Sequence, residues 1–140
     1  MSEAGTERRE KKRSESMDEV FKKQLEEGGA DVDITLKRFM GNEAIYMKFI
    51  LKFLEDKNYD MIMDSLEKKD YAGAFAGAHS LKGVSGNLGL NPVYEASSQI
   101  TELLRDKQDA DVDTQKLNEA KEQLEKSYCR LQKIIRDNNP

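Results

Sequence analysis

The chain has 140 residues, which is enough for one domain and too few for a kinase that carries its own ATP-binding domain. Its 23 Lys and Arg against 27 Asp and Glu give a formal net charge of −4, which argues against the basic surface that nucleic-acid binding requires. A single Cys and a single His exclude a disulfide framework and a zinc site of Cys and His ligands. The only histidine, His79, is therefore the residue to explain.

Residues 1–16 interleave basic and acidic side chains and hold almost no apolar ones. A segment that buries no apolar surface cannot offset its chain entropy, so a disordered or frayed charged tail is predicted here. Residues 17–140 are expected to form one domain. No stretch approaches the roughly 20 apolar residues that cross a bilayer, and no leader peptide is expected, so a cytoplasmic protein without membrane contact is predicted.

The spacing of apolar residues predicts helices along the rest of the chain. In chain order they lie at about 17–27, 33–40, 43–56, 58–69, 71–88, 91–107 and 113–136. Asn42 and Asp70 are candidate N-caps, and Asn91 with Pro92 combines a candidate cap with a first-turn proline. No sustained alternation of apolar and polar residues indicates a strand. Amphipathic helices joined by short connections predict an all-α, antiparallel helical bundle.

The helix predicted at 71–88 is unusually rich in glycine, because five of the chain's 9 Gly lie between residues 73 and 89. Each glycine inside a helix costs up to about 1 kcal/mol relative to alanine, so the four interior ones cost on the order of 3–4 kcal/mol. That is a large share of the roughly 5–15 kcal/mol that stabilises a small domain. Either close helix packing or the close approach of a partner must require small residues here.

Spacings of three and four residues place one stripe of this helix in the core: Tyr71, Ala74, Ala78, Leu81, Ser85 and Leu88. His79 lies beside the stripe toward solvent, with Lys82 and Gly83 one turn ahead and alanines behind. A lone helical histidine is most often a surface residue without a role, and a lysine is most often simply solvated. A bare surface, however, lets another protein bring a reacting group to the imidazole, which is nucleophilic at neutral pH.

Residues 79–89 closely resemble the signature of histidine-containing phosphotransfer (HPt) domains, H-x-L-K-G-x-[SA]-x-x-L-G. All seven fixed positions match, namely His79, Leu81, Lys82, Gly83, Ser85, Leu88 and Gly89. The resemblance covers about residues 30–136, and residues 1–28 have no counterpart. It implies an antiparallel four-helix bundle with short accessory N-terminal helices.

The resemblance also implies a function, which is transfer of a phosphoryl group between His79 and the aspartate of receiver domains in response regulators or hybrid histidine kinases. Lys82 would stabilise charge on the phosphoryl group, Gly83 would leave room for the incoming aspartate, and Gly89 would end the helix. The chain is expected to be a monomeric phosphoryl carrier rather than an enzyme. It would bind no ATP, cofactor or metal of its own, since Mg²⁺ is expected from the receiver.

One position departs from the family pattern. Many members carry Glu or Gln on the next helix, where it approaches the imidazole, but this chain has Thr101 there. Ser98, Gln99 or Glu102 are the alternatives for orienting the ring, unless no residue does so. Two other functions stay open. One is a module that binds a receiver or kinase without transfer, and the other is the phosphorylatable N-terminal domain of a chemotaxis-type kinase.

Overall fold

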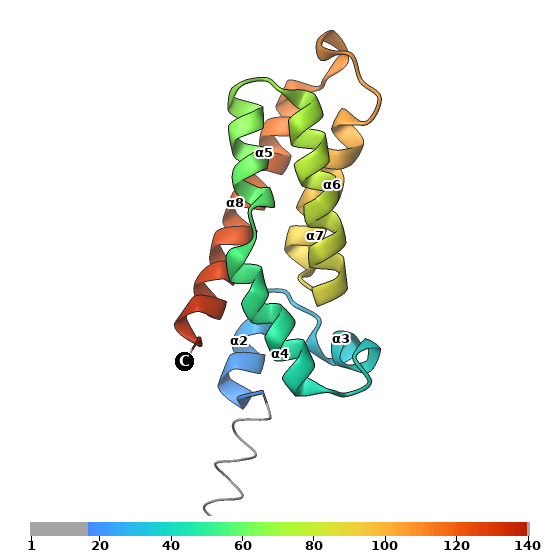
Figure 1. Cartoon of the computed structure of the whole chain (residues 1–140). Coiled ribbons are helices and arrows are strands. Elements are labelled where there is room, and N and C mark those ends of the chain that lie inside the picture. The colour runs from blue at the N-terminus through green and yellow to red at the C-terminus, as the bar shows by residue number, and fades with distance from the viewer. Residues whose placement is uncertain (1–16, 140) are drawn as a thin grey trace, which may run out of the picture.

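The computed structural model describes residues 17–139, and every regular element in this range is helical (Figure 1). The elements are α2 (Glu19–Glu27), α3 (Val32–Arg38), α4 (Glu43–Lys52), the 3₁₀ turn η1 (Phe53–Glu55), α5 (Asn58–Glu67), α6 (Tyr71–Leu88), α7 (Asn91–Leu104), the 3₁₀ turn η2 (Asp109–Asp111) and α8 (Thr114–Asp137). The predicted all-α class is confirmed. The tail predicted at residues 1–16 lies outside the described residues.

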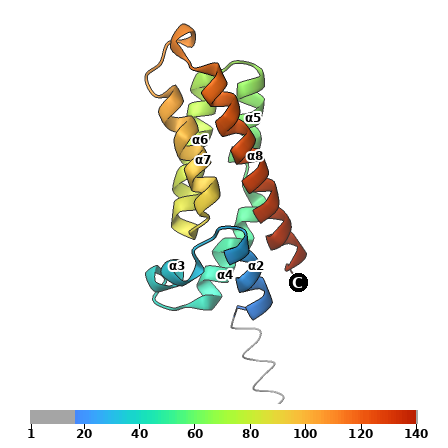
Figure 2. The ribbon, with the colours of Figure 1, turned by 180° about the vertical axis from the view of Figure 1, so that it is seen from behind.

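The four helices α5 to α8 lie side by side, and α2, α3 and α4 cover one end of them (Figures 1 and 2). One hydrophobic core runs through the whole described range, from Met17 near α2 to Ile135 in α8. Its fully buried side chains include Ile62 in α5, Leu81 in α6 and Ile100 in α7. No helix within residues 17–139 combines the length and the apolar character that a bilayer span needs.

Local sequence signals set most helix ends. The side chains of Asn42 and Asp70 accept hydrogen bonds from the backbone N–H groups of Ile45 (3.1 Å) and Gly73 (3.0 Å), so both are N-caps as predicted. The helix predicted at 91–107 does begin at Asn91, but the predicted cap Asn91 and the predicted C-terminal end were wrong. Leu90 is the cap of α7 because its carbonyl accepts from the N–H of Tyr94 (2.9 Å). The helix ends at Leu104, where the backbone turns extended at residue 105.

Helix α6 buries the predicted stripe with one exception, since Tyr71 at its start is only half-buried. Gly77 is buried as well and faces α5. A Cβ atom on Gly77 would lie 2.9 Å from Cγ1 of Ile62 and 3.3 Å from the carbonyl oxygen of Asn58. Gly83, by contrast, has no atom within 4 Å of the position that a Cβ would take. Close packing of α6 against α5 therefore explains the glycine at position 77. The glycine at position 83 has no such packing reason, because the space beside it is free.

Residues before η1 hold the C-terminal end of α6. The backbone N–H of Asp31 donates to the carbonyl of Gly89 (2.9 Å), and the guanidinium of Arg38 donates to that of Gly86 (3.2 Å). The hydroxyl of Tyr46, whose pKa is raised by burial, donates to the carbonyl of Leu88 (3.3 Å). These contacts satisfy carbonyl groups that a helix end otherwise leaves unpaired. The segment 31–46 thereby fixes the position of α6.

Replacing Gly89 by alanine is expected to lower the free energy of unfolding by about 2–3 kcal/mol. Gly89 ends α6 with a left-handed φ of 70°, and an added Cβ would collide with Oγ1 of Thr35 and lie 2.9 Å from the carbonyl of Asp31. Gly41 is a matched control, because its φ is 74° but no atom lies within 4 Å of its Cβ position. Urea denaturation followed by circular dichroism measures both variants. Equal losses at the two positions would show that the contact with Thr35 does not matter.

Candidate functional site

The three site residues predicted from the sequence lie within one turn in the middle of α6. His79 and Gly83 are exposed and Lys82 is half-buried. Ala76, one turn before His79 and two turns before Gly83, is exposed as well. On the side of Ala76 and Gly83 the imidazole therefore has only short neighbours in its own helix, and no side chain of the described residues lies within 4 Å of the position that a Cβ of Gly83 would take. A group carried by another protein can reach the ring along this side.

The ammonium group of Lys82 forms no ion pair with any carboxylate in residues 17–139, where the three ion pairs present join other side chains. Lys82 lies at i+3 from His79, so the two side chains share one helix face. A cation without a carboxylate partner beside an exposed imidazole is suited to an anion bound at that ring. The same part of the chain gathers no group of three or more His, Cys, Asp or Glu side chains that would hold a metal ion.

None of the four residues considered for orienting the imidazole forms a hydrogen bond with it. Thr101 is fully buried, and its hydroxyl donates to the carbonyl of Ser97 in its own helix (2.7 Å). Gln99 and Glu102 line a groove between α7 and α8, and the hydroxyl of Ser98 has no partner. Within residues 17–139 no side chain or backbone group forms a hydrogen bond with the His79 ring.

Sequence reasoning missed the residue that does contact the ring plane. Phe75, one turn before His79, has its ring parallel to the imidazole, with 6.0 Å between the ring centroids and 2° between the planes. The guanidinium carbon of Arg105 lies 5.4 Å from the centroid of the Phe75 ring. An aromatic residue four positions before a helical histidine is the signal that could have indicated the stack, because such side chains lie on the same face.

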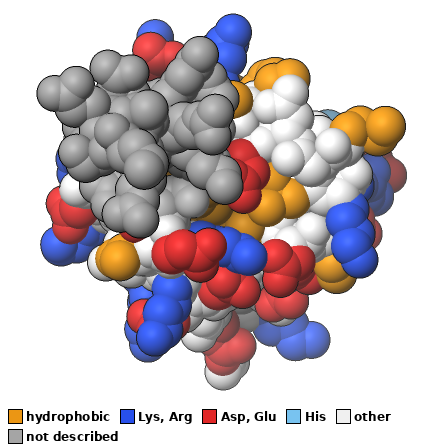
Figure 3. All heavy atoms as spheres, turned by 90° about the horizontal axis from the view of Figure 1, so that it is seen from below, with side chains coloured by type: hydrophobic (Ala, Val, Ile, Leu, Met, Phe, Trp, Pro, Cys, Tyr) orange, Lys and Arg blue, Asp and Glu red, His pale blue; other side chains and the backbone are white. Residues whose placement is uncertain are grey.

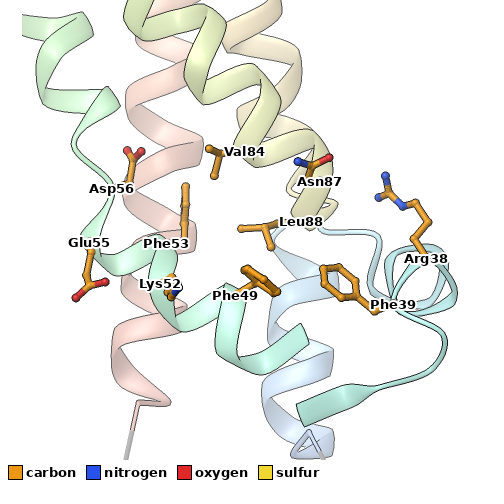
Figure 4. Close-up of a pocket in the computed structure, with 10 residues that line it drawn as sticks. All are labelled: Arg38, Phe39, Phe49, Lys52, Phe53, Glu55, Asp56, Val84, Asn87 and Leu88. Atoms are coloured by element: carbon orange, nitrogen blue, oxygen red, sulfur yellow. The ribbon is translucent and has the colours of Figure 1, made fainter. Parts of the chain in front are cut away.

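A groove of about 540 Å³ lies between the C-terminal half of α6 and the segment α3–η1 (Figure 4). Apolar side chains from both sides line it, together with charged side chains and one amide: Phe39, Phe49, Phe53, Val84 and Leu88, with Arg38, Lys52, Glu55, Asp56 and Asn87. Phe49 is 42% exposed and lines this groove. Val84 follows Gly83 in the chain and is itself exposed, so the groove begins less than two turns beyond His79 along α6.

Charged side chains of both signs are mixed on the end of the molecule formed by α2, α3 and α4 (Figure 3). On the part of this face that the described residues show, basic and acidic side chains alternate and neither kind forms a separate patch. The mixed charge agrees with the net charge of −4, and the expectation that the chain does not bind nucleic acid stays a prediction.

The family model described as "Hpt domain" matches residues 54–133, more than half of the chain, and this range includes the whole of α6. The chain belongs to the Hpt domain family. An Hpt domain is a phosphotransfer module of two-component signalling and a phosphoryl carrier rather than an ATP-using enzyme. No curated protein and no solved structure matches the chain. Helices α3 and α4, which hold the end of α6 and contribute to one wall of the groove, precede the matched range.

Proposed function

We propose that this Hpt domain is a phosphorelay intermediate in which His79 accepts a phosphoryl group from the aspartyl phosphate of a receiver domain and passes it to another. The observation that carries the proposal is the exposed imidazole of His79 beside an open position at Gly83. The ammonium of Lys82, which pairs with no carboxylate in the described chain, supports it. Receiver domains, as the usual partners of the family, are the donor and the acceptor.

In the transfer step, the lone pair of the solvent-facing ring nitrogen attacks phosphorus in line with the bond to the aspartate. That P–O bond breaks, and its electron pair leaves with the aspartate carboxylate. The imidazole then loses its remaining N–H proton to solvent, which leaves a neutral ring bonded to the phosphoryl group. Lys82 offsets negative charge on the phosphoryl oxygens during the step, and the reverse step runs through the same arrangement.

Mg²⁺ for the transfer comes, in this proposal, from the acidic pocket of the receiver, so that the Hpt domain itself contributes only the nucleophile and Lys82. The helices α5 to α8 constitute the antiparallel four-helix bundle of the family, and α6 presents His79 on its surface. The receiver covers the exposed side of α6 and reaches toward the groove that begins at Val84. The monomeric state and the cytoplasmic location stay predictions.

The test is phosphoryl transfer from receiver domains charged with radiolabelled acetyl phosphate. The wild-type protein is expected to gain phosphate that is labile to acid and stable to alkali, as a phosphoramidate is, and His79→Gln is expected to gain none. His79 is exposed, so the substitution leaves the core intact and the fold can be verified by circular dichroism. Equal labelling of the wild type and His79→Gln by every receiver would rule out the proposal.

One observation favours the non-transferring module instead, namely the absence of a hydrogen-bond partner for the imidazole within residues 17–139. The same experiment separates the two functions when receiver binding is measured beside the labelling. A receiver that binds the Hpt domain with micromolar affinity but transfers no label, even with Mg²⁺ present, would identify a binding module. Binding accompanied by labelling of His79 identifies the relay intermediate.

A further inference from the structure

The orientation of the imidazole matters for in-line transfer, because a reacting group must be held close to its productive geometry. A hydrogen bond to one ring nitrogen commonly fixes such a ring. In this protein Thr101 uses its hydroxyl within α7, and no other described group forms a hydrogen bond with the imidazole. A contact other than a hydrogen bond must therefore limit rotation of the ring about its bond to Cβ.

Phe75 makes the contact that can limit this rotation. Its ring is parallel to the imidazole within 2°, and the centroids are 6.0 Å apart, in the range of offset-stacked aromatic pairs. Phe75 is itself half-buried and packs against the hydrophobic core, so its ring does not move freely. A parallel, anchored ring one turn before His79 disfavours imidazole orientations that cross its plane.

Arg105 supports the Phe75 ring from the end of α7. Its guanidinium carbon lies 5.4 Å from the Phe75 centroid, which is within the reach of a cation–π contact. The guanidinium is held in turn by Glu102, whose Oε1 accepts hydrogen bonds from Nε and Nη2 of Arg105 at 3.2 Å each. A chain of contacts thus runs from Glu102 through Arg105 and Phe75 to the imidazole.

We propose that Phe75, held in place by Arg105, is the positioning residue of His79 and replaces the hydrogen bond that Thr101 does not supply. This inference rests on the proposed function, because it assigns Phe75 a role in phosphoryl transfer. Stacking holds the plane of the imidazole so that the attacking nitrogen faces the open side of α6 above Gly83. Phe75 acts only through the ring of His79 and forms no bond to the phosphoryl group.

The experiment compares two phosphoryl donors for Phe75→Leu. With a charged receiver domain the donor's position is fixed by docking, so loss of the stack is expected to slow transfer about tenfold. With phosphoramidate, a small donor that can approach the ring from any side, the rate is expected to stay within about twofold of the wild type. Phe75→Tyr keeps the aromatic plane and is expected to transfer within about twofold of the wild type from both donors.

Tyr71→Leu is the matched control, because Tyr71 is a half-buried aromatic residue of the same helix, two turns from His79, with no stacking on it. It is expected to transfer at the wild-type rate. The proposal is overturned if Phe75→Leu transfers from the receiver at the wild-type rate. It is also overturned if Tyr71→Leu is equally slow, or if the phosphoramidate rate falls as far as the receiver rate.

A spectroscopic measurement keeps the inference separate from the proposed function. His79 is the only histidine, so its ring protons are identified in NMR spectra without further variants. Nuclear Overhauser effects between the rings of His79 and Phe75 are expected in the unphosphorylated protein, and their absence overturns the stack. If the effects are present but no receiver labels even the wild type, the proposed function fails while the ring contact stands. In that case the role of Phe75 in transfer is rejected.

Discussion

Replacing Gly83 by glutamine is expected to slow phosphoryl transfer from a receiver to His79 about a hundredfold. A glutamine side chain one turn from the imidazole would occupy the space that the donor's aspartate must enter, because no atom lies within 4 Å of the Cβ position now. The same substitution is expected to raise the free energy of unfolding by about 0.5–1 kcal/mol, since glycine is a poor helix residue and the site is exposed. Function and stability should therefore change in opposite directions.

Two variants give this prediction its controls. Gly83→Ala adds a single methyl group. This variant should gain a similar amount of stability, but its transfer rate should fall only about threefold. Gly77→Ala lies in the same helix, but its Cβ would press on buried Ile62, so it is expected to destabilise the protein by about 1 kcal/mol. Urea denaturation and the receiver assay measure both quantities. A Gly83→Gln variant that transfers at the wild-type rate would show that the donor approaches from another side.

Replacing Lys82 by glutamine is expected to slow phosphoryl transfer by roughly tenfold to a hundredfold, without a matching loss of affinity for the receiver. Lys82 lies beside His79 on α6, and its ammonium pairs with no carboxylate in residues 17–139. A nearby cation stabilises the negative charge on the phosphoryl oxygens most strongly during transfer, when the bond between phosphorus and the donor oxygen is breaking. Removing that cation should therefore affect the transfer rate more than the binding of the receiver.

The measurement is single-turnover transfer at saturating receiver, together with the dissociation constant from titration calorimetry. Lys82→Arg keeps the positive charge and should recover most of the rate. Lys48→Gln, an exposed lysine of α4, removes the same charge from another element and serves as the control for long-range steering. If Lys82→Gln and Lys48→Gln weaken binding equally and leave the saturated rate unchanged, Lys82 only attracts the receiver and does not stabilise the transferring group.

Signals that act over a few residues were read correctly from the sequence. The caps Asn42 and Asp70 depend on hydrogen bonds to residues three positions ahead, and Gly89 ends α6 through its own backbone angle. The buried stripe of α6 follows from a period of 3.6 residues. The predicted cap of α7, Asn91, was wrong because the actual cap, Leu90, has no side-chain signal of a cap.

Contacts between distant residues were not predictable. Phe49 is an aromatic residue of α4, yet its side chain is 42% exposed and lines the groove beside Leu88 of α6, which no local pattern in α4 predicts. Arg105 reaches the ring of Phe75 from another helix, 30 positions along the chain, and nothing in either local sequence pairs them. The carbonyls of Gly86 and Gly89 accept hydrogen bonds from Arg38 and Asp31, which lie about 50 positions earlier in the chain, and no local pattern predicts these pairs either.

The sequence by itself determined that His79, Lys82 and Gly83 share one face of a glycine-rich helix, because helical periodicity is a local property of the chain. Only the tertiary structure decided which glycine of α6 packs against another helix and which has free space beside it. Gly77 packs against α5, whereas no side chain of the described residues lies within 4 Å of the Cβ position of Gly83. The tertiary structure also decided that the imidazole rests beside Phe75 rather than on a side chain of α7. Those outcomes depend on how helices distant in sequence pack together, and no short stretch of residues contains that information.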